Sequence, residues 1–123
     1  MKPETALRIG RAERFLVQAE EYQAERAPEA IIHLAYYAML HAAAAVLIER
    51  LGRAPKTHGA IIGQFSNLTV TDGDRGQSLS RRFNKAQNIR LASDYGDENA
   101  TASEAAEMRE AARAFLAYCR SLV

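Results

Sequence analysis

Residues 29–51, EAIIHLAYYAMLHAAAAVLIERL, decide the fold of this chain. Drawn as a helix, the stretch is apolar on every side, and a helix of this kind is buried rather than exposed to solvent. His33 and His41 interrupt it, and Glu49 and Arg50 close it, so it offers no unbroken apolar run of about 20 residues that could cross a bilayer. The stretch therefore predicts the central helix of a helical bundle that has no membrane partner.

The composition describes one ordinary folded domain, which we expect to comprise residues 1–123. The chain has 48% hydrophobic and 25% charged residues, as globular proteins do and disordered ones do not. Its formal net charge is +1, so any preference for an anionic partner must come from a local patch. Cys119 is the single cysteine, which excludes an internal disulfide and a multi-cysteine metal site. The N-terminus carries charges throughout and lacks an apolar signal segment, so we expect a cytoplasmic protein.

Apolar periodicity around the central stretch predicts an all-α fold. Further helices are expected over about residues 4–25, 58–68, 75–93 and 102–122. Thr57 suits an N-cap, and Thr101 with Glu104 forms a capping-box pattern. Residues 69–78, TVTDGDRGQS, have the composition of a loop. The short connections favour antiparallel neighbours, and we therefore expect an up-down four-helix bundle with one extra short helix.

Three polar side chains form a stripe on the central helix, because His33, Tyr37 and His41 follow one another at intervals of four residues. Two histidines with a tyrosine between them can form a polar pocket against the helix over 75–93, and histidine acts as an acid or base near neutral pH. The alternative is that each is a hydrogen-bonded core residue. No HExxH motif and no Cys or carboxylate spacing accompanies them, so we expect no metal and no cofactor.

Arg90 continues the apolar stripe of the helix over 75–93, and Asp94 follows it by one helical turn. Charged side chains are rarely buried unless they are paired. One interpretation is an Arg90–Asp94 ion pair that closes the helix end, or an Arg90 that reaches a carbonyl of another helix. The other is that Arg90 lines a cleft and binds an anionic ligand, with Asp94 and Tyr95 beside it. A planar guanidinium suits this role because it binds two phosphate oxygens at once.

Residues 75–90 contain no acidic residue and five basic ones, namely Arg75, Arg81, Arg82, Lys85 and Arg90. Such a run offers a site for a phosphodiester backbone, in which Arg82 and Lys85 join Arg90 as candidate contacts. The alternative is a solvated helix face whose charge is balanced by acids on neighbouring helices.

The segment Lys56-Thr57-His58 lies where the expected helix over 58–68 begins. The free N–H groups of a helix start can bind an anion. The simpler interpretation, a helix cap followed by an exposed His58, is favoured.

Three segments together resemble a known family: HLAYYAMLHAAAAVLIERLG at 33–52, KTHGAIIGQF at 56–65, and IRLASDY at 89–95, ahead of a capped last helix. In this order they are similar to the small stand-alone HEPN-domain proteins of bacteria and archaea, and the resemblance covers nearly the whole chain. It implies a four-to-five-helix up-down bundle, commonly a homodimer. It also implies a partner, because such proteins are often encoded beside a minimal nucleotidyltransferase and can form a toxin–antitoxin pair with it.

Active relatives in this family are metal-independent RNases with an R-x4-6-H motif near the end of the fourth helix, and the dimer brings two copies of the motif into one cleft. By the resemblance, Arg90 matches the arginine of the motif. The histidine does not carry over, since Asp94 and Tyr95 stand four and five residues after Arg90 and no histidine occurs from 91 to 101. The matching segment therefore lacks the usual acid–base residue of these enzymes.

Three hypotheses follow for this chain. The first is a module that binds RNA or a nucleotide phosphate; its candidate ligand contacts are Arg90, Arg82, Lys85, His41 and Tyr37. The second is a metal-independent RNase in which Arg90 is joined by Asp94, Tyr95 or a histidine of the central helix in proton transfer. The third is an interaction protein in which the Arg90–Asp94 pair is only a clamp.

Overall fold

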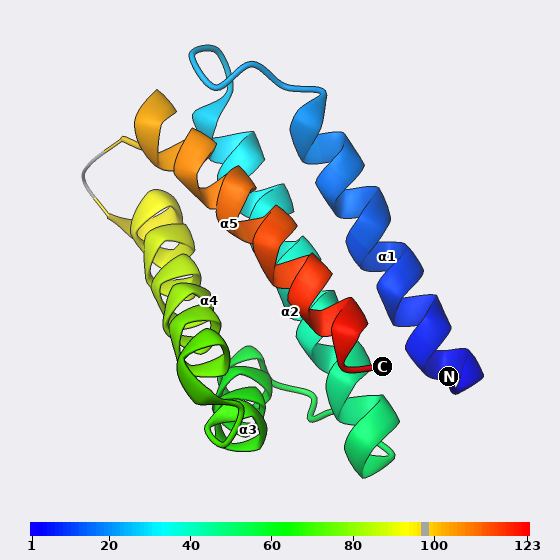
Figure 1. Cartoon of the computed structure of the whole chain (residues 1–123). Coiled ribbons are helices and arrows are strands. Elements are labelled where there is room, and N and C mark those ends of the chain that lie inside the picture. The colour runs from blue at the N-terminus through cyan, green and yellow to red at the C-terminus, as the bar shows by residue number, and fades with distance from the viewer. Residues whose placement is uncertain (97–98) are drawn as a thin grey trace.

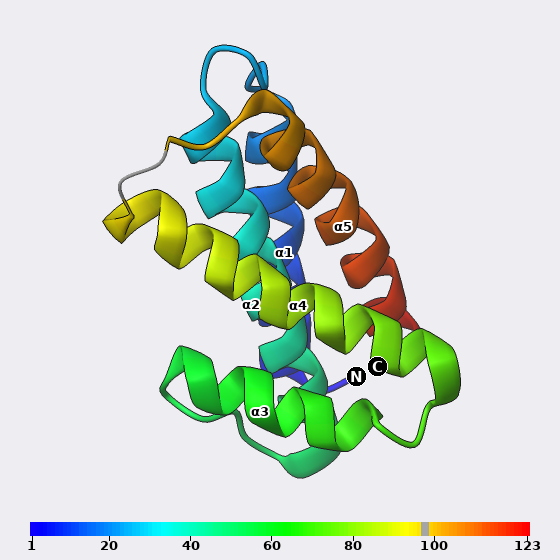
Figure 2. The same ribbon diagram turned by 90° about the vertical axis from the view of Figure 1, so that its left-hand side faces the viewer.

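The computed structural model describes residues 1–96 and 99–123, except for the side chain of Tyr95. This part of the chain forms five helices: α1 (Pro3–Glu20), α2 (Pro28–Leu51), α3 (His58–Thr69), α4 (Gly73–Tyr95) and α5 (Ala102–Ser121). Helices α1, α2, α4 and α5 run alternately up and down, and the short α3 lies near the C-terminal end of α2 (Figure 1). The expected all-α class is confirmed. Figure 2 adds that α4 runs obliquely across the bundle rather than parallel to α2 and α5.

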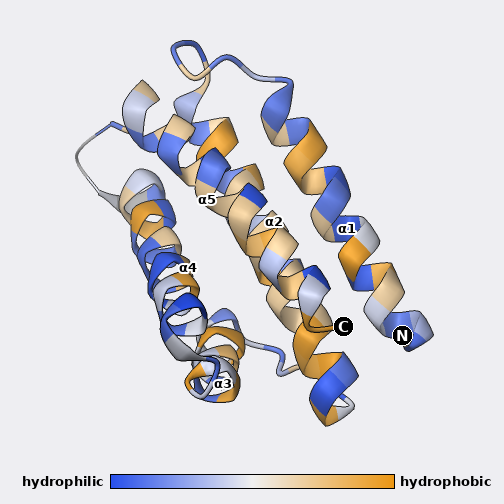
Figure 3. Ribbon diagram, viewed as in Figure 1, coloured by the Kyte–Doolittle hydropathy of each residue, from blue (hydrophilic) through white to orange (hydrophobic). Residues whose placement is uncertain are grey.

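Helix α2 is the centre of the bundle and contacts all four other helices. Every residue from Ala42 to Ile48 is buried, and the alanines among them let neighbouring helices approach closely. Figure 3 shows hydrophobic residues along most of α2, whereas the other long helices mix hydrophobic and hydrophilic positions. By length and composition alone α2 could cross a membrane, but most of it is buried among the other helices. Its apolar character is therefore that of a core helix.

An aromatic cluster joins α3, α4 and α5 to one another. The ring centroids of Phe65 on α3 and Phe83 on α4 lie 6.0 Å apart, and both rings contact Phe115 on α5, at 5.1 and 4.9 Å. All three side chains are fully buried. Aromatic pairs in this distance range contribute beyond the area that they bury, so this cluster holds α4 in its oblique position.

The expected helix caps are confirmed. The hydroxyl of Thr57 accepts a hydrogen bond from the backbone N–H of Ala60 at 3.2 Å. Thr101 and Glu104 form both bonds of a capping box, each 3.0 Å long. These bonds satisfy N–H groups that a helix start leaves without partners.

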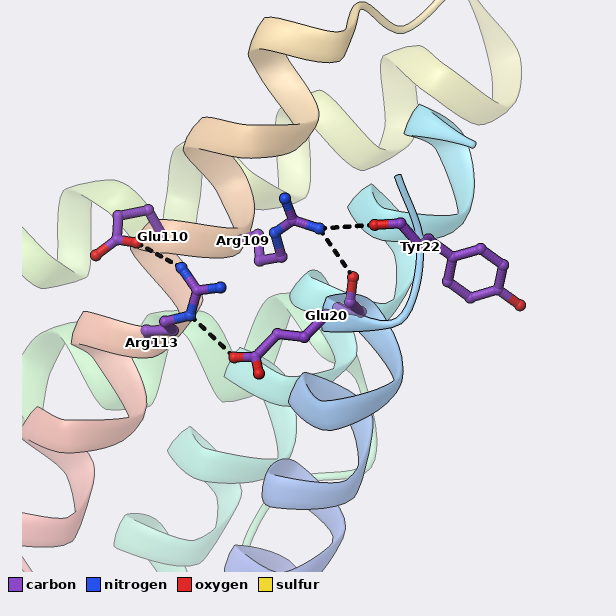
Figure 4. Close-up of polar contacts among 6 residues, drawn as sticks. Glu20, Tyr22, Arg109, Glu110 and Arg113 are labelled. Atoms are coloured by element: carbon purple, nitrogen blue, oxygen red, sulfur yellow. Dashed lines mark hydrogen bonds and ion pairs between the residues drawn. The ribbon is translucent and has the colours of Figure 1, made fainter. Parts of the chain in front are cut away.

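The end of α1 differs from the prediction, because the helix stops at Glu20 rather than near residue 25. Tyr22, which lies within the range expected for this helix, is outside it and is 46% exposed. Arg109 on α5 donates to the carbonyl oxygens of Ala19 and Tyr22 at 3.1 and 3.0 Å, and Arg113 donates to Glu20 at 2.9 Å (Figure 4). Arg109 thus binds one carbonyl in the last turn of α1 and one just beyond it, while Arg113 binds the carboxylate of Glu20. The periodicity of α1 carries no sign of these partners on α5.

The expected loop over 69–78 is wrong, since α3 continues to Thr69 and α4 already begins at Gly73. Gly73 has a φ of 68°, which glycine adopts without strain and which lets the chain turn sharply. At Gly76 an added Cβ would lie 2.5 Å from the carbonyl oxygen of Thr69 and 2.9 Å from the hydroxyl of Tyr118. Of the glycines that suggested a loop, Gly73 therefore makes the turn into α4, and Gly76 allows α4 to pack closely against α3 and α5.

Candidate functional site

Helix α2 reaches the surface along one narrow strip. Between Ile31 and Ile48, the residues that are not buried are His33, Leu34, Tyr37 and His41. His33, Tyr37 and His41 are the three polar residues whose spacing marks a stripe, and we call them the α2 strip. The strip lies between α1 on one side and α3 and α4 on the other, because its residues contact Phe15, His58 and Asp94 on those helices.

At the first end of the α2 strip, His33 meets the end of α4. The Nε2 of His33 lies 2.5 Å from Oδ1 of Asp94, while Nη1 of Arg90 lies 3.5 Å from Oδ2 of the same carboxylate. The tight partner of Asp94 is therefore His33, and its contact with Arg90 is at the long limit of a hydrogen bond. An imidazole held by a carboxylate is thus placed beside a guanidinium, and we call this group of three residues the α2–α4 corner.

Arg90 is held in place mainly by an aromatic ring. Its guanidinium carbon lies 5.1 Å from the ring centroid of Tyr36, within the range of a cation–π contact. The side chain is 13% exposed, and within the described part of the chain its Nε is buried without a hydrogen-bond partner. Arg90 is therefore fixed in position, while its N–H groups make few strong hydrogen bonds. N–H groups in this state bind an anion readily.

Tyr36 and His58 lie beside Arg90 and complete its surroundings. The hydroxyl of Tyr36 lies 3.1 Å from Nδ1 of His58. Burial raises the pKa of Tyr36 to about 12, an effect that Arg90 opposes, whereas burial and then Arg90 lower the pKa of His58. Tyr36 therefore donates to a neutral His58. Neither residue is among the predicted site residues. The apolar character of α2 predicts that Tyr36 is a core residue, and the favoured interpretation of His58 is an exposed residue after a helix cap. The one sequence signal for this part of the site is the Lys56-Thr57-His58 segment at the start of α3.

At the second end of the α2 strip, His41 faces α1. Arg8 donates from Nη1 to Nδ1 of His41 at 3.0 Å, and the His41 ring stacks on Phe15 with centroids 5.3 Å apart and planes 9° apart. Burial, followed by the charges of Arg8 and other arginines of α1, lowers the pKa of His41 to about 4. His41 is therefore neutral at physiological pH, with Nδ1 as an acceptor and its proton on Nε2.

A hollow of about 360 Å³ lies beside His41, and we call it the α1 hollow. It is lined by Arg11, Arg14, Phe15, Gln18 and His41. Tyr37, in the middle of the strip, joins the two ends, since its ring centroid lies 5.8 Å from that of Phe15 and 5.9 Å from that of His58.

The predicted ligand-binding residues do not form a single site. Arg82 and Lys85 face α5 across a cleft of about 350 Å³, which the acidic residues Glu104, Glu107 and Glu110 also line. This arrangement corresponds to the alternative in which acids on a neighbouring helix balance the basic run. Arg90 faces α2 instead.

The other predicted site residues also separate. His41 contacts α1 rather than α4, whereas Asp94 lies beside Arg90 as expected. The expectation for Tyr95 lies outside the described side chains.

The α2–α4 corner brings together groups that can bind an anion and move a proton. Asp94 fixes the orientation of the His33 ring, as a carboxylate does for a general base, and Arg90 supplies positive charge beside it. Within residues 1–96 and 99–123, no three His, Cys, Asp or Glu side chains lie close enough together to hold a metal ion. The three residues of the α2–α4 corner are of types suited to anion binding and to proton transfer.

Comparison with known proteins agrees with this architecture. Residues 5–122 match the sequence profile of the HEPN domain family. Over 71 residues the chain is 34% identical to a protein of Methanocaldococcus jannaschii that is named as a putative toxin; the match covers 58% of this chain and 52% of the relative. The matched segment thus spans about half the length of that relative. The family match covers nearly the whole chain, and the chain belongs to the HEPN domain family.

Proposed function

We propose that this HEPN protein binds RNA and acts as a toxin-type protein, holding a phosphate of the RNA at the α2–α4 corner. The observation that carries the proposal is the environment of Arg90, whose guanidinium lies over Tyr36 and, among the described residues, makes a single long contact with a carboxylate. Phosphate oxygens would supply the short, charge-assisted hydrogen bonds that this guanidinium lacks. The name of the archaeal relative supports the toxin part of the proposal.

The surroundings of Arg90 favour RNA over an isolated anion. The corner is continuous with partly exposed aromatic rings of Tyr37 and His58, and proteins that bind single strands combine cationic groups with such stacking faces. A ligand with both phosphates and bases would use the whole α2 strip, whereas a free phosphate would use Arg90 alone.

A second candidate is a metal-independent RNase, and the His33–Asp94 contact of 2.5 Å favours it. His33 supplies in space the histidine that the R-x4-6-H pattern lacks after Arg90. In this reaction His33, oriented by Asp94, takes the proton of a ribose 2′-hydroxyl as the 2′-oxygen attacks the adjacent phosphorus. Arg90 stabilises the charge on the phosphoryl oxygens. The bond from phosphorus to the 5′-oxygen breaks, His33 returns its proton to that oxygen, and a 2′,3′-cyclic phosphate remains.

We also propose the assembly that the resemblance implies: a cytoplasmic homodimer controlled by a minimal nucleotidyltransferase. Co-expression with the neighbouring reading frame, followed by size-exclusion chromatography, tests both parts. A stable complex of the two proteins supports the pairing. A chain that elutes as a monomer alone and with the neighbour contradicts it.

The experiment for the function measures binding and cleavage of a labelled, unstructured RNA in EDTA. Arg90→Ala should weaken binding by about 10-fold to 100-fold, the loss expected for a charged hydrogen-bonding group. The matched control is Arg53→Ala, which removes the same charge from an exposed position. Circular dichroism and a second variant, Arg90→Lys, separate loss of binding from loss of folding.

The outcomes distinguish the two candidates. Cleavage that disappears in both His33→Ala and Arg90→Ala establishes the RNase. Binding without cleavage leaves the RNA-binding module. If Arg90→Ala binds RNA as tightly as Arg53→Ala does, the proposal that a phosphate occupies the corner is wrong.

A further inference from the structure

We propose that the α1 hollow is a second phosphate subsite, which holds the same RNA strand at a point a few nucleotides from Arg90. The identity of the ligand rests on the proposed function. The subsite itself rests on separate residues of α1 and on the second end of the α2 strip.

The arginines of α1 differ from those of α5 in their ion pairing. In the described part of the chain, Arg8, Arg11 and Arg14 form no ion pair with a carboxylate. The arginines of α5 behave differently, because Arg113 binds Glu20 and Glu110, and Arg120 binds Glu13. The charges of Arg113 and Arg120 are thus paired within the fold, and Arg8 is bound to His41, whereas Arg11 and Arg14 have no carboxylate partner among the described residues.

The α1 hollow also carries a suitable set of donors. Arg11 and Arg14 line it with guanidinium groups, and neutral His41 adds an Nε2–H because its Nδ1 is occupied by Arg8. Guanidinium forks and imidazole N–H groups together suit the oxygens of a phosphodiester. The pKa of His41, which is lowered by burial and then by the positive charges of Arg8 and Arg11, agrees with this geometry.

The two sites are continuous with each other. Aromatic side chains connect them without a gap, through contacts of 5.3 Å (His41–Phe15), 5.8 Å (Phe15–Tyr37), 5.9 Å (Tyr37–His58) and 5.7 Å (His58–Tyr36). His33 and His41 are eight residues apart on one helix, which is a separation of about 12 Å along its axis. A short length of single strand spans this distance, and its bases can stack on the partly exposed rings.

The test compares two double variants that remove the same charge. Arg11→Ala/Arg14→Ala removes the hollow's guanidinium groups, and Arg26→Ala/Arg53→Ala removes two exposed arginines elsewhere. The probes are oligouridine of about 12 nucleotides, which can reach both sites, and the dinucleotide UpU, which can fill only one. Fluorescence anisotropy is recorded over a series of salt concentrations. All four substituted arginines are exposed, so neither double variant should unfold the bundle.

The subsite predicts a specific pattern. Arg11→Ala/Arg14→Ala should weaken binding of the longer RNA by about 10-fold and lower its salt slope by about 0.7 for each phosphate that the protein no longer binds. The same variant should bind UpU at the corner as the control does. If its affinity for the longer RNA and its salt slope equal those of the control, the subsite does not exist.

The result separates the two proposals. If Arg90→Ala weakens binding and Arg11→Ala/Arg14→Ala does not, the function stands without the second subsite. If Arg90→Ala has no effect and Arg11→Ala/Arg14→Ala weakens binding, the hollow binds RNA and the corner does not. If neither variant weakens binding, both proposals are overturned.

Discussion

His33 and His41 lie on the same strip of one helix, two turns apart, and yet their surroundings are opposite. His33 contacts the carboxylate of Asp94 at 2.5 Å, so its N–H has an acceptor. His41 accepts a hydrogen bond from Arg8 at 3.0 Å, so the lone pair of its unprotonated nitrogen, Nδ1, is already used. The spacing on α2 determines which face the two residues share, whereas α1 and α4 determine what each can do. The same residue type thus offers acid–base chemistry at one end of the strip and a fixed neutral donor at the other.

The largest effect is expected where the carboxylate meets His33. In the RNase, Asp94→Asn should slow cleavage by about 100-fold or more, because the amide no longer orients and supports the imidazole as a base. RNA affinity should not fall, since the substitution removes a negative charge that repels phosphate. Cleavage rate and anisotropy are measured against Glu29→Gln, which changes an exposed acid of α2 rather than the acid of α4. Weaker RNA binding by Asp94→Asn than by this control would contradict a phosphate site beside Arg90.

The next effect is acid destabilisation that originates at His41. Its pKa is about 4 in the folded chain, against an ordinary value of 6.5, so the folded chain binds fewer protons than the unfolded chain between these values. Stability should therefore fall as the pH decreases from about 6.5 to 4. We expect roughly 1–2 kcal/mol from this residue, discounted from the full linkage because the side chain is partly exposed.

Urea denaturation at neutral pH and near pH 4 measures this contribution. His41→Gln should lose less stability on acidification than the unmodified chain. Arg53→Gln is the control, because it changes an exposed residue away from the strip and keeps His41, so it should lose as much as the unmodified chain. If all three proteins lose the same free energy of unfolding on acidification, His41 is not the cause of the acid destabilisation.

A smaller effect tests the cause of the His41 shift. Arg8→Ala removes the nearest positive charge and the hydrogen bond to Nδ1, so the pKa of His41 should rise by roughly one unit toward its ordinary value. Titration of the His41 ring protons by NMR measures it directly, with Arg53→Ala as the charge-matched control. A pKa that does not move would show that Arg8 does not contribute to the shift.

The smallest effect concerns the hydroxyl of Tyr36. Tyr36→Phe removes its hydrogen bond to His58 and should cost about 0.5–1.5 kcal/mol of stability, while the ring beneath Arg90 remains. RNA affinity should therefore stay unchanged. The comparison is Tyr118→Phe, which removes a hydroxyl bonded to Asp72 away from the strip. A loss of RNA affinity in Tyr36→Phe as large as in Arg90→Ala would mean that the hydroxyl itself contacts the ligand.

Most of the fold could be predicted because its signals are local. The apolar run of α2 and the caps at Thr57 and Thr101 depend on residues within a few positions of one another. The errors arose where another helix decides the outcome. Arg109, which binds a carbonyl in the last turn of α1, lies about 90 residues further along the chain. Gly76 packs against α3 and α5 instead of marking a loop.

Less of the candidate site could be predicted, for the same physical reason. The Arg90–Asp94 pair is visible as an i, i+4 contact, and the α2 strip as a helical stripe. Periodicity does not say which neighbour a face meets, so it grouped His41 with Arg90 although the two contact different helices. The pairing of Tyr36 with His58 joins α2 to α3, and no spacing within either helix encodes it.

The most direct test of RNA binding at the α2–α4 corner is a map of where RNA touches the protein. Oligouridine is titrated into isotopically labelled protein, and NMR shifts of the histidine rings and arginine side chains are followed. We predict the largest shifts at His33 and Arg90, extending along the strip to His41. Shifts confined to Arg82 and Lys85, in the cleft between α4 and α5, would contradict this prediction and would transfer the binding site to the other face of α4.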